Sequence, residues 1–136
     1  KQYLQAAEKA AEKVAVPVGA VVVCKGRTIA RAHNTTEQLT DVTAHAEMLA
    51  ITAASDALNG KFLNQCTLYV TLEPCPMCAG ALHWARLGKL VYGAADEKRG
   101  YVRYQPNMLH PNTEVAFGLE QAACASLLTQ FFRARR

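Results

Sequence analysis

The sequence predicts a single α/β domain of three layers, in which a mixed sheet of about five strands carries helices on both faces. Its 136 residues are enough for one well-packed core and too few for two. A hydrophobic content of 51% with only 19% charged residues indicates a folded chain rather than a disordered one. Segments with helical spacing of apolar residues alternate with short buried strands after an initial hairpin. One domain is therefore expected to span residues 1–136.

The first half of the chain contains strong stop signals between its elements. Pro17 ends the first helix, and a Lys25-Gly26 turn joins the two strands of the hairpin. Thr43 is the expected N-cap of the next helix, which Asn59-Gly60 stops. The expected elements, in order, are a helix at 3–14, strands at 20–24 and 28–32, a loop at 34–42 and a helix at 43–58.

The second half repeats the alternation of strand and helix. "CTLYVTL" is almost continuously apolar, as expected of a strand covered on both faces. Pro76 is acceptable in the first turn of the helix that follows, and Gly88 ends that helix. The expected elements, in order, are a strand at 66–72, a helix at 75–87, a strand at 89–94, a loop at 95–112, a strand at 113–118 and a helix at 119–133.

The cysteines point to a reducing compartment. The five are Cys24, Cys66, Cys75, Cys78 and Cys124, an odd number, and three of them stand among apolar neighbours. Such a set does not resemble a disulfide framework, so we expect a cytoplasmic protein in which Cys24, Cys66 and Cys124 are small buried hydrophobic residues. No apolar run approaches the roughly 20 residues that cross a bilayer, so no membrane partner is expected.

The net charge of +4 is unevenly placed. Residues 1–85 carry seven basic and seven acidic side chains, whereas residues 86–136 carry eight basic and four acidic ones. A cationic surface for a polyanion such as RNA is one interpretation of this excess. An ordinary solvated helix end is the other.

Two short motifs carry the chemistry. In "EPCPMCAGAL", Cys75 and Cys78 are three residues apart at the head of a helix, so they project from one face and can share a metal ion. In "TAHAEMLAI", His45 and Glu47 are two residues apart, and such a pair points in different directions on a helix. One metal ligand with a neighbouring acid–base group fits that spacing better than two ligands.

Together the motifs match the H-x-E and P-C-x-x-C signature of zinc-dependent nucleobase deaminases. Three protein ligands leave the fourth tetrahedral position to water, and one zinc ion per chain would lower the pKa of that water towards neutrality. Glu47 would pass the proton to the ring nitrogen and help the amine leave. A redox dithiol would give His45 and Glu47 no role. A structural zinc would need a fourth ligand, for which the candidates are Cys24, Cys66, His33, His83 and His110.

The resemblance reaches beyond this signature. "VPVGAVVV", "DVTAHAEMLAI", "TLYVTLEPCPMCAGAL", "VYGA" and "FFRARR" make the chain similar to the bacterial tRNA-specific adenosine deaminases. This resemblance implies a cytidine-deaminase-like fold, one zinc ion and conversion of adenosine to inosine at the wobble position of a tRNA anticodon. It also implies a homodimer that binds the anticodon loop.

The resemblance assigns roles to particular residues. It implies that His45, Cys75 and Cys78 bind zinc and that Glu47 is the proton shuttle. The substrate base is expected to contact the Asn34 amide, the backbone amide of Ala46 and a pocket wall made by Pro17, Val18, Gly19 and Ala20. Asn34 has a second interpretation as a loop-capping residue, because asparagine is common in turns.

RNA binding has its own candidates. "DEKRGYVRY" interleaves cations for phosphates with aromatic rings for unpaired bases, and a further cluster of arginines ends the chain. Alternatively, these segments are a solvated loop and a frayed helix end. The candidate residues are Lys98, Arg99, Tyr101, Arg103, Tyr104, Arg133, Arg135 and Arg136.

The sequence departs from the family pattern in places. Val42 stands where the family has proline, and the segment 101–112 is shorter than usual. "LHWARL" is similar to free-base guanine deaminases, so a deaminase of guanine, cytosine or a nucleoside is the second hypothesis. A non-catalytic zinc or redox module is the third. Trp84 is expected in the core.

Overall fold

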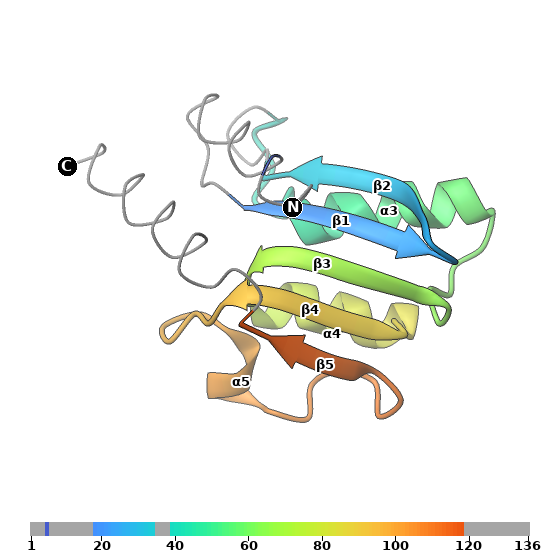
Figure 1. The fold of residues 1–136 in the computed structure, drawn as a ribbon. Helices are drawn as coiled ribbons and strands as arrows, with labels where there is room; N and C mark the ends of the chain where they lie inside the picture. The colour runs from blue at the N-terminus through green and yellow to red at the C-terminus, as the bar shows by residue number, and fades with distance from the viewer. Residues whose placement is uncertain (1–4, 6–17, 35–38, 119–136) are drawn as a thin grey trace.

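Five strands form one mixed sheet in the order β2-β1-β3-β4-β5 (Figure 1). The computed structural model describes residue 5 and residues 18–34 and 39–118. The strands are β1 (Gly19–Cys24), β2 (Arg27–His33), β3 (Cys66–Leu72), β4 (Lys89–Ala94) and β5 (Glu114–Phe117). The hairpin partners β1 and β2 are antiparallel, and β1 is also antiparallel to β3. The pairs β3–β4 and β4–β5 are parallel.

The hairpin turn has the backbone that its sequence requires. Lys25 and Gly26 both have positive φ, 52° and 78°, which matches the twist of a tight two-residue hairpin. The pairing of β1 with β2 shifts register between Val22 and Val23, two residues before the turn.

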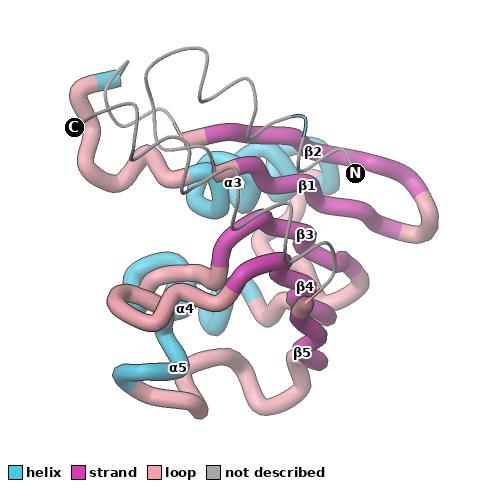
Figure 2. The backbone as a smooth tube through the Cα atoms, turned by 60° about the vertical axis from the view of Figure 1, so that its left-hand side comes forward, coloured by secondary structure: helices cyan, strands magenta, loops and turns pink. Residues whose placement is uncertain are grey.

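The helices are α3 (Ala46–Leu58), α4 (Pro76–Ala85) and the short α5 (Tyr101–Tyr104). Figures 1 and 2 show α3 and α4 side by side on the same face of the sheet. The predicted mixed sheet of five strands with packed helices is therefore confirmed. The helices expected at 3–14 and 119–133, and Cys124, lie outside the described residues.

Small alanines let the helices approach the sheet closely. Ala46, Ala50 and Ala54 of α3 and Leu82 of α4 are fully buried against the inward residues of the strands. Alternation along β1 is visible in the core, because Val22 belongs to this helix-covered face and Val21 to the opposite one. Cys24 and Cys66, paired across β1 and β3, are buried as expected.

Three expectations about local structure are wrong. The helix expected from residue 43 begins at Ala46 with His45 as its N-cap, and Thr43 lies before it in a turn where its backbone amide (2.9 Å) and hydroxyl (2.7 Å) both donate to Asp41 Oδ1. A short helix, α5, lies within the segment expected to be only loop.

Trp84, expected in the core, is 80% exposed. Helix α4 is apolar on every side, so its sequence does not distinguish the inner face from the outer one. No helix in the described part of the chain is long and apolar enough to cross a membrane.

Candidate active site

The functional side chains converge because of the strand directions. The start of β1 pairs with the ends of β2 and β3, since both pairings are antiparallel, and β4 ends beside β3. The chain leaves β3 three residues before α4, and α3 begins at the same edge of the sheet. The N-termini of α3 and α4 therefore lie beside the open end of the hairpin, where β1 starts and β2 ends. Open α/β sheets bind ligands at such a position.

His45, Cys75 and Cys78 form a compact group at this edge. His45 Nδ1 lies 3.6 Å from Cys75 Sγ and 3.5 Å from Cys78 Sγ, and the three ligand atoms all lie within 4.8 Å of one another. Tetrahedral zinc, with bonds of about 2.3 Å to sulfur and about 2.0–2.1 Å to nitrogen, requires a separation of about 3.6 Å between those atoms. The donor set and its spacing therefore fit a zinc ion.

The position of each ligand follows from its helix. His45 and Cys75 are the N-caps of α3 and α4, both with extended backbone, and Pro76 occupies the first turn of α4. Cys78 lies one turn into α4 and is fully buried. N-cap positions place both side chains beside helix N-termini, whose positive ends favour anionic ligands.

The two thiols share a proton unequally. The pKa of Cys75 is lowered to about 5, first because the Cys78 side chain hydrogen-bonds to it, and further by the backbone amide of Cys78 and by His45. The same hydrogen bond and burial raise the pKa of Cys78. One thiolate is thus present at neutral pH, and a bound cation would favour the second.

Glu47 stands beside this group as a buried carboxyl. It is only 4% exposed, and burial raises its pKa to about 7 against the opposing effect of its own backbone amide. The charges of Cys75 and His45 also act on its pKa, in opposite directions, so the carboxyl lies close to this group. A carboxyl that titrates near neutrality can both accept and return a proton.

No fourth protein ligand joins the group within the part of the chain that the structure describes. Among those residues, His45, Cys75 and Cys78 are the one group of histidine, cysteine or carboxylate side chains close enough together to hold a metal ion. Cys24 and Cys66 lie in the buried core, on β1 and β3. The geometry therefore favours an open, catalytic metal site over a closed structural one. It also favours a metal site over a redox dithiol, because a dithiol would not need His45 and Glu47 beside the cysteines.

A cavity of about 710 Å³ opens onto the group. Its size is that of pockets for small ligands, so a nucleoside fits. Segments from all the converging elements line it: Val18, Asn34, His45, Ala46, Glu47, Leu72, Glu73, Cys75 and residues 95–99.

Asn34 and Ala46 lie where substrate contact was expected. The Asn34 backbone donates to Val18 O (3.1 Å), which joins the end of β2 to the start of β1. Its side chain is 8% exposed, and Oδ1 has no hydrogen-bond partner among the described residues. A buried acceptor without a partner is costly, so a donor from a ligand would satisfy it.

The pocket wall is narrower than expected. Val18 lines the cavity, but Gly19 donates its backbone amide to Thr71 Oγ1 (3.2 Å) and Ala20 is fully buried in the core. The expectation that Gly19 and Ala20 contact the base therefore stays a prediction, since neither residue lines this cavity. Pro17 lies outside the described residues.

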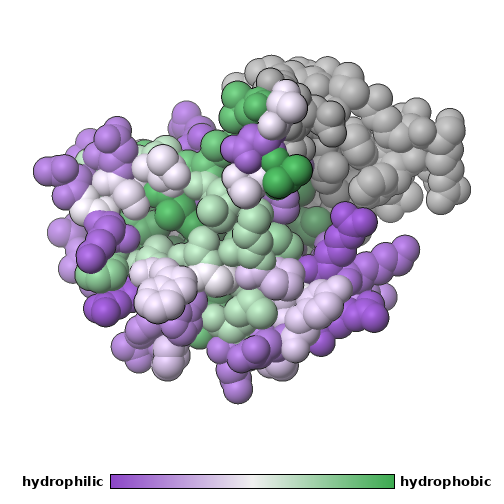
Figure 3. Space-filling view, turned by 180° about the vertical axis from the view of Figure 1, so that it is seen from behind, coloured by the Kyte–Doolittle hydropathy of each residue, from purple (hydrophilic) through white to green (hydrophobic). Residues whose placement is uncertain are grey.

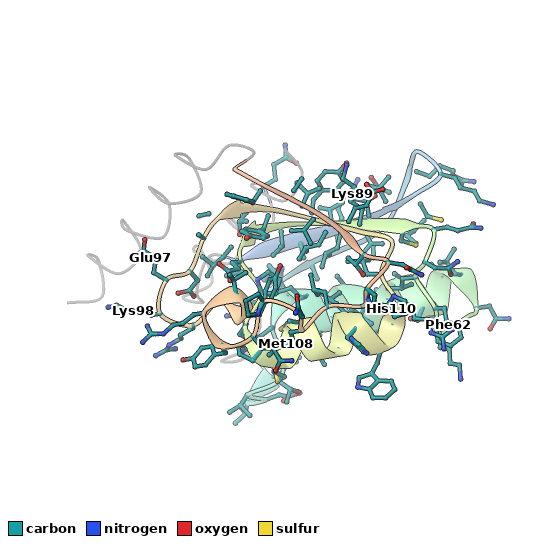
Figure 4. The ribbon with its side chains drawn as sticks, turned by 90° about the horizontal axis from the view of Figure 1, so that it is seen from below. Phe62, Lys89, Glu97, Lys98, Met108 and His110 are labelled. Carbon is teal, nitrogen blue, oxygen red and sulfur yellow. The ribbon has the colours of Figure 1, made fainter. Side chains whose placement is uncertain are left out.

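Residues 95–104 are here called the basic loop, and residues 95–99 of this segment line the cavity. Lys98 and Arg99 are exposed and line it, and their backbone amides donate to Asp96 Oδ1. Figure 4 shows Lys98 pointing outward at this end of the molecule. Arg103 and Tyr104 are exposed as well, and their side chains donate to Glu97 O and Lys98 O.

Tyr101 does not match its expected role. Its ring is 3% exposed and packs in the core, and burial raises its pKa to about 12. A buried ring cannot stack on a base, so stacking is left to Tyr104. The arginines 133, 135 and 136 lie outside the described residues.

Glu73 was not singled out from the sequence. It is 5% exposed and lines the cavity between the metal ligands and the basic loop. The sequence did contain a signal for Glu73, because this carboxylate stands directly between a buried strand and the cysteine motif. A carboxylate buried at such a position needs hydrogen-bond partners to offset its lost solvation.

Three metal ligands with a proton acceptor beside them are suited to activating water for hydrolysis, and the mixed sheet that holds them is cytidine-deaminase-like. This defines a hydrolytic deaminase. The comparisons agree. The family model described as MafB19-like deaminase matches residues 1–136.

The chain is 46% identical over 135 residues to the tRNA-specific adenosine deaminase of Agrobacterium fabrum, covering 96% of this chain and 89% of that protein. It is 46% identical over 141 residues to the enzyme of the same name from Bacillus subtilis, covering 100% and 88%. The chain therefore belongs to the MafB19-like deaminase family and, within it, to the tRNA-specific adenosine deaminases.

Two solved structures differ in how similar they are to this chain. A structure from studies of A-to-I editing at the wobble position of transfer RNA superposes with a TM-score of 0.87 at 45% identity, covering 93% of this chain and 96% of that one. A guanine deaminase from Nitrosomonas europaea superposes with 0.84 at 26% identity, covering 95% and 80%. The predicted family and fold are confirmed, and the guanine deaminase is the more distant relative.

Proposed function

We propose that this protein hydrolyses adenosine to inosine at the wobble position of a tRNA anticodon, with one zinc ion per chain. The observation that carries the proposal is the His45–Cys75–Cys78 group beside buried Glu47, in a cavity that Lys98 and Arg99 also line. The relatives at 46% identity, which act on tRNA by name, support this substrate.

A zinc ion held by the three ligands would supply a water activated at neutral pH. Glu47 would accept one proton of the attacking water and deliver it to N1 of the purine as the water oxygen bonds to C6. It would then carry the second proton from that oxygen to the amino group, so the C6–N bond breaks, the C6 carbonyl forms and ammonia leaves. The raised pKa of Glu47 suits both transfers.

The wobble base must leave its stack to reach this site. A flipped base is recognised by hydrogen bonds at its edge and by close packing. The Asn34 amide offers a donor and an acceptor at one side of the cavity, and Ala46 contributes a backbone amide beside the metal ligands. Val18 supplies an apolar wall.

The basic loop is the proposed contact for the anticodon backbone. Lys98 and Arg99 stand at the cavity mouth, where phosphates flanking a flipped base would lie, and Tyr104 offers an exposed ring. We include the arginines 133, 135 and 136 in the same proposal on charge alone. Because the described helices do not include a membrane span and the cysteines indicate a reducing compartment, we place the protein in the cytoplasm.

A homodimer is proposed on the outer face of α4. Met77, Gly80, Ala81 and Trp84, here called the apolar stripe, recur at helical spacing on that face, and Met77 and Trp84 are 38% and 80% exposed. Figure 3 shows the side of the molecule that bears α3 and α4, with green and pale atoms across its centre and purple atoms at its margins. An uncovered apolar helix face is typical of an interface, and we propose that a second copy covers it.

The test is inosine formation. Zinc-loaded protein is incubated with an anticodon stem-loop that bears a wobble adenosine and, separately, with guanine, cytosine and adenosine. Inosine in the stem-loop, lost in Glu47→Gln, is the expected result.

A free-base deaminase is the second candidate, because the guanine deaminase fold is closely similar. Ammonia released from guanine while the stem-loop stays unmodified would establish that candidate and overturn the first.

A further inference from the structure

Glu73 lies between the metal-ligand group and the basic loop. It follows β3 directly and precedes Cys75 by two residues, yet its side chain points towards the basic loop. It is 5% exposed, and burying a carboxylate is costly unless hydrogen bonds compensate.

Both carboxylate oxygens receive backbone donors from the loop. The Asp96 amide donates to Oε1 (3.1 Å) and the Val102 amide donates to Oε2 (3.0 Å). One side chain therefore holds the two ends of the segment 96–102, which carries Lys98 and Arg99 between them. Charge-assisted bonds of this kind are stronger than bonds between neutral groups.

The main chain continues the same attachment. The Glu73 amide donates to Ala94 O (2.8 Å), and the Tyr101 amide donates to Pro74 O (2.9 Å). The segment that ends in Cys75 is thus tied at three points to the basic loop and at a fourth to the last residue of β4.

Gly100 provides independent evidence that the carboxylate position is built in. Its backbone, φ −67° and ψ 150°, is available to any residue. A Cβ there, however, would overlap Glu73 Oε2 and lie 2.6 Å from Asp96 O. Glycine is required by the space that the carboxylate occupies and not by backbone conformation.

We propose that Glu73 is a positioning residue that sets the basic loop against the metal site and thereby fixes Lys98 and Arg99 for RNA binding. The role in RNA binding rests on the proposed function, whereas the attachment of the loop does not. Glu73 touches neither the base nor the metal in this proposal, so it acts on substrate affinity more than on the chemical step.

Two variants test the attachment from opposite sides. Glu73→Gln keeps the shape but replaces one acceptor oxygen with a donor, and Gly100→Ala keeps the carboxylate but displaces it. Gly60→Ala is the matched control, because a Cβ there meets only Leu58 O at 3.9 Å. Amide hydrogen exchange of residues 96–102 and zinc content are measured in each.

The expected result is exchange about ten- to a hundredfold faster in the loop for both variants, the range for losing a hydrogen bond to a charged group. Zinc content should stay at one per chain, and Gly60→Ala should match the parent protein. Unchanged loop exchange in both variants would overturn the proposal, whatever the substrate proves to be.

Kinetics on the wobble stem-loop test the consequence for binding. KM should rise about tenfold or more while kcat changes less than about threefold. The variant loses binding energy that the substrate and the transition state share equally, whereas the groups that carry out the chemical step are unchanged. The effect of Glu73→Gln on KM should shrink when Lys98 and Arg99 are both glutamine, because the changes act through one loop.

Loss of zinc, or a fall in kcat at constant KM, would instead place the action of Glu73 on the metal segment and overturn the proposal. A parent protein that leaves the stem-loop unmodified would refute the proposed function, while the exchange data would still decide whether Glu73 holds the loop.

Discussion

At the scale of single residues, burial gives Glu47 its chemistry. A carboxyl that is 4% exposed loses solvation of its charged form, and its pKa rises to about 7. An exposed glutamate keeps its pKa well below neutrality and is a weak base at neutral pH, so the same residue type at the surface would take the proton from water less readily.

We predict that Glu47→Gln lowers kcat about 10²- to 10⁴-fold, the usual contribution of a positioned acid–base group, and leaves zinc bound. Steady-state deamination and metal analysis measure the two effects. Glu114→Gln, an exposed change on β5, is the control and should leave both unchanged. Full activity in Glu47→Gln would remove the carboxyl from the mechanism.

Substitution of a cysteine in the metal group and of one in the core distinguishes a three-ligand catalytic zinc site from a four-ligand structural one. We predict that Cys75→Ala loses zinc, because two ligands hold the ion poorly, whereas Cys66→Ala keeps one ion per chain. Metal analysis after dialysis distinguishes them. Loss of zinc from Cys66→Ala in a folded protein would support a four-ligand structural site.

At the scale of elements, the site depends on two helix starts and one loop. The ligands could be predicted from the sequence because each lies within a short motif on a recognisable helix. The exact start of α3 could not, because Thr43 forms a turn with Asp41 ahead of the helix, and a threonine in such a turn has the same sequence signal as an N-cap.

Burial was the weakest inference at this scale. Trp84 was expected in the core, but α4 has no polar face to indicate which side is outside. Tyr101 was expected at the surface from its neighbours Lys98 and Arg99, yet the short helix α5 turns it inward. Glu73 was missed because its partners are backbone amides, which carry no sequence signal.

We predict that replacing Lys98 and Arg99 together with glutamine weakens stem-loop binding and flattens its salt dependence. Each lost phosphate contact should lower the slope of log K against log salt by about 0.7, the value for single strands. Lys61→Gln is the control, because it lies next to Phe62, which Figure 4 places at the opposite end of the molecule from Lys98. An unchanged slope would exclude these side chains from phosphate contact.

At the scale of the whole molecule, the apolar stripe on α4 is the feature that a monomer does not explain. We predict that Trp84→Ser weakens the dimer about 30-fold or more, as expected when a central aromatic residue is removed from an interface. Sedimentation over a concentration series measures this. Val115→Ser, at a residue 44% exposed on β5, is the control. A monomeric parent protein would exclude the dimer.

The fold followed from the sequence with few errors, since each strand and both longer helices between 19 and 117 have their own periodicity and stop signal, whereas the four-residue α5 does not. The sequence does not reveal how strand direction gathers the end of β2, the starts of α3 and α4 and the basic loop at one edge. That convergence turns separate motifs into a site for a flipped base.

The most direct measurement is the position of inosine in a whole tRNA with a wobble adenosine and other adenosines in its anticodon loop. After incubation with the zinc-loaded protein, nuclease digestion and mass spectrometry locate each deaminated base. Inosine at the wobble position alone, absent with Glu47→Gln, is the predicted result. An unmodified tRNA, with ammonia released from free guanine by the same preparation, would contradict it.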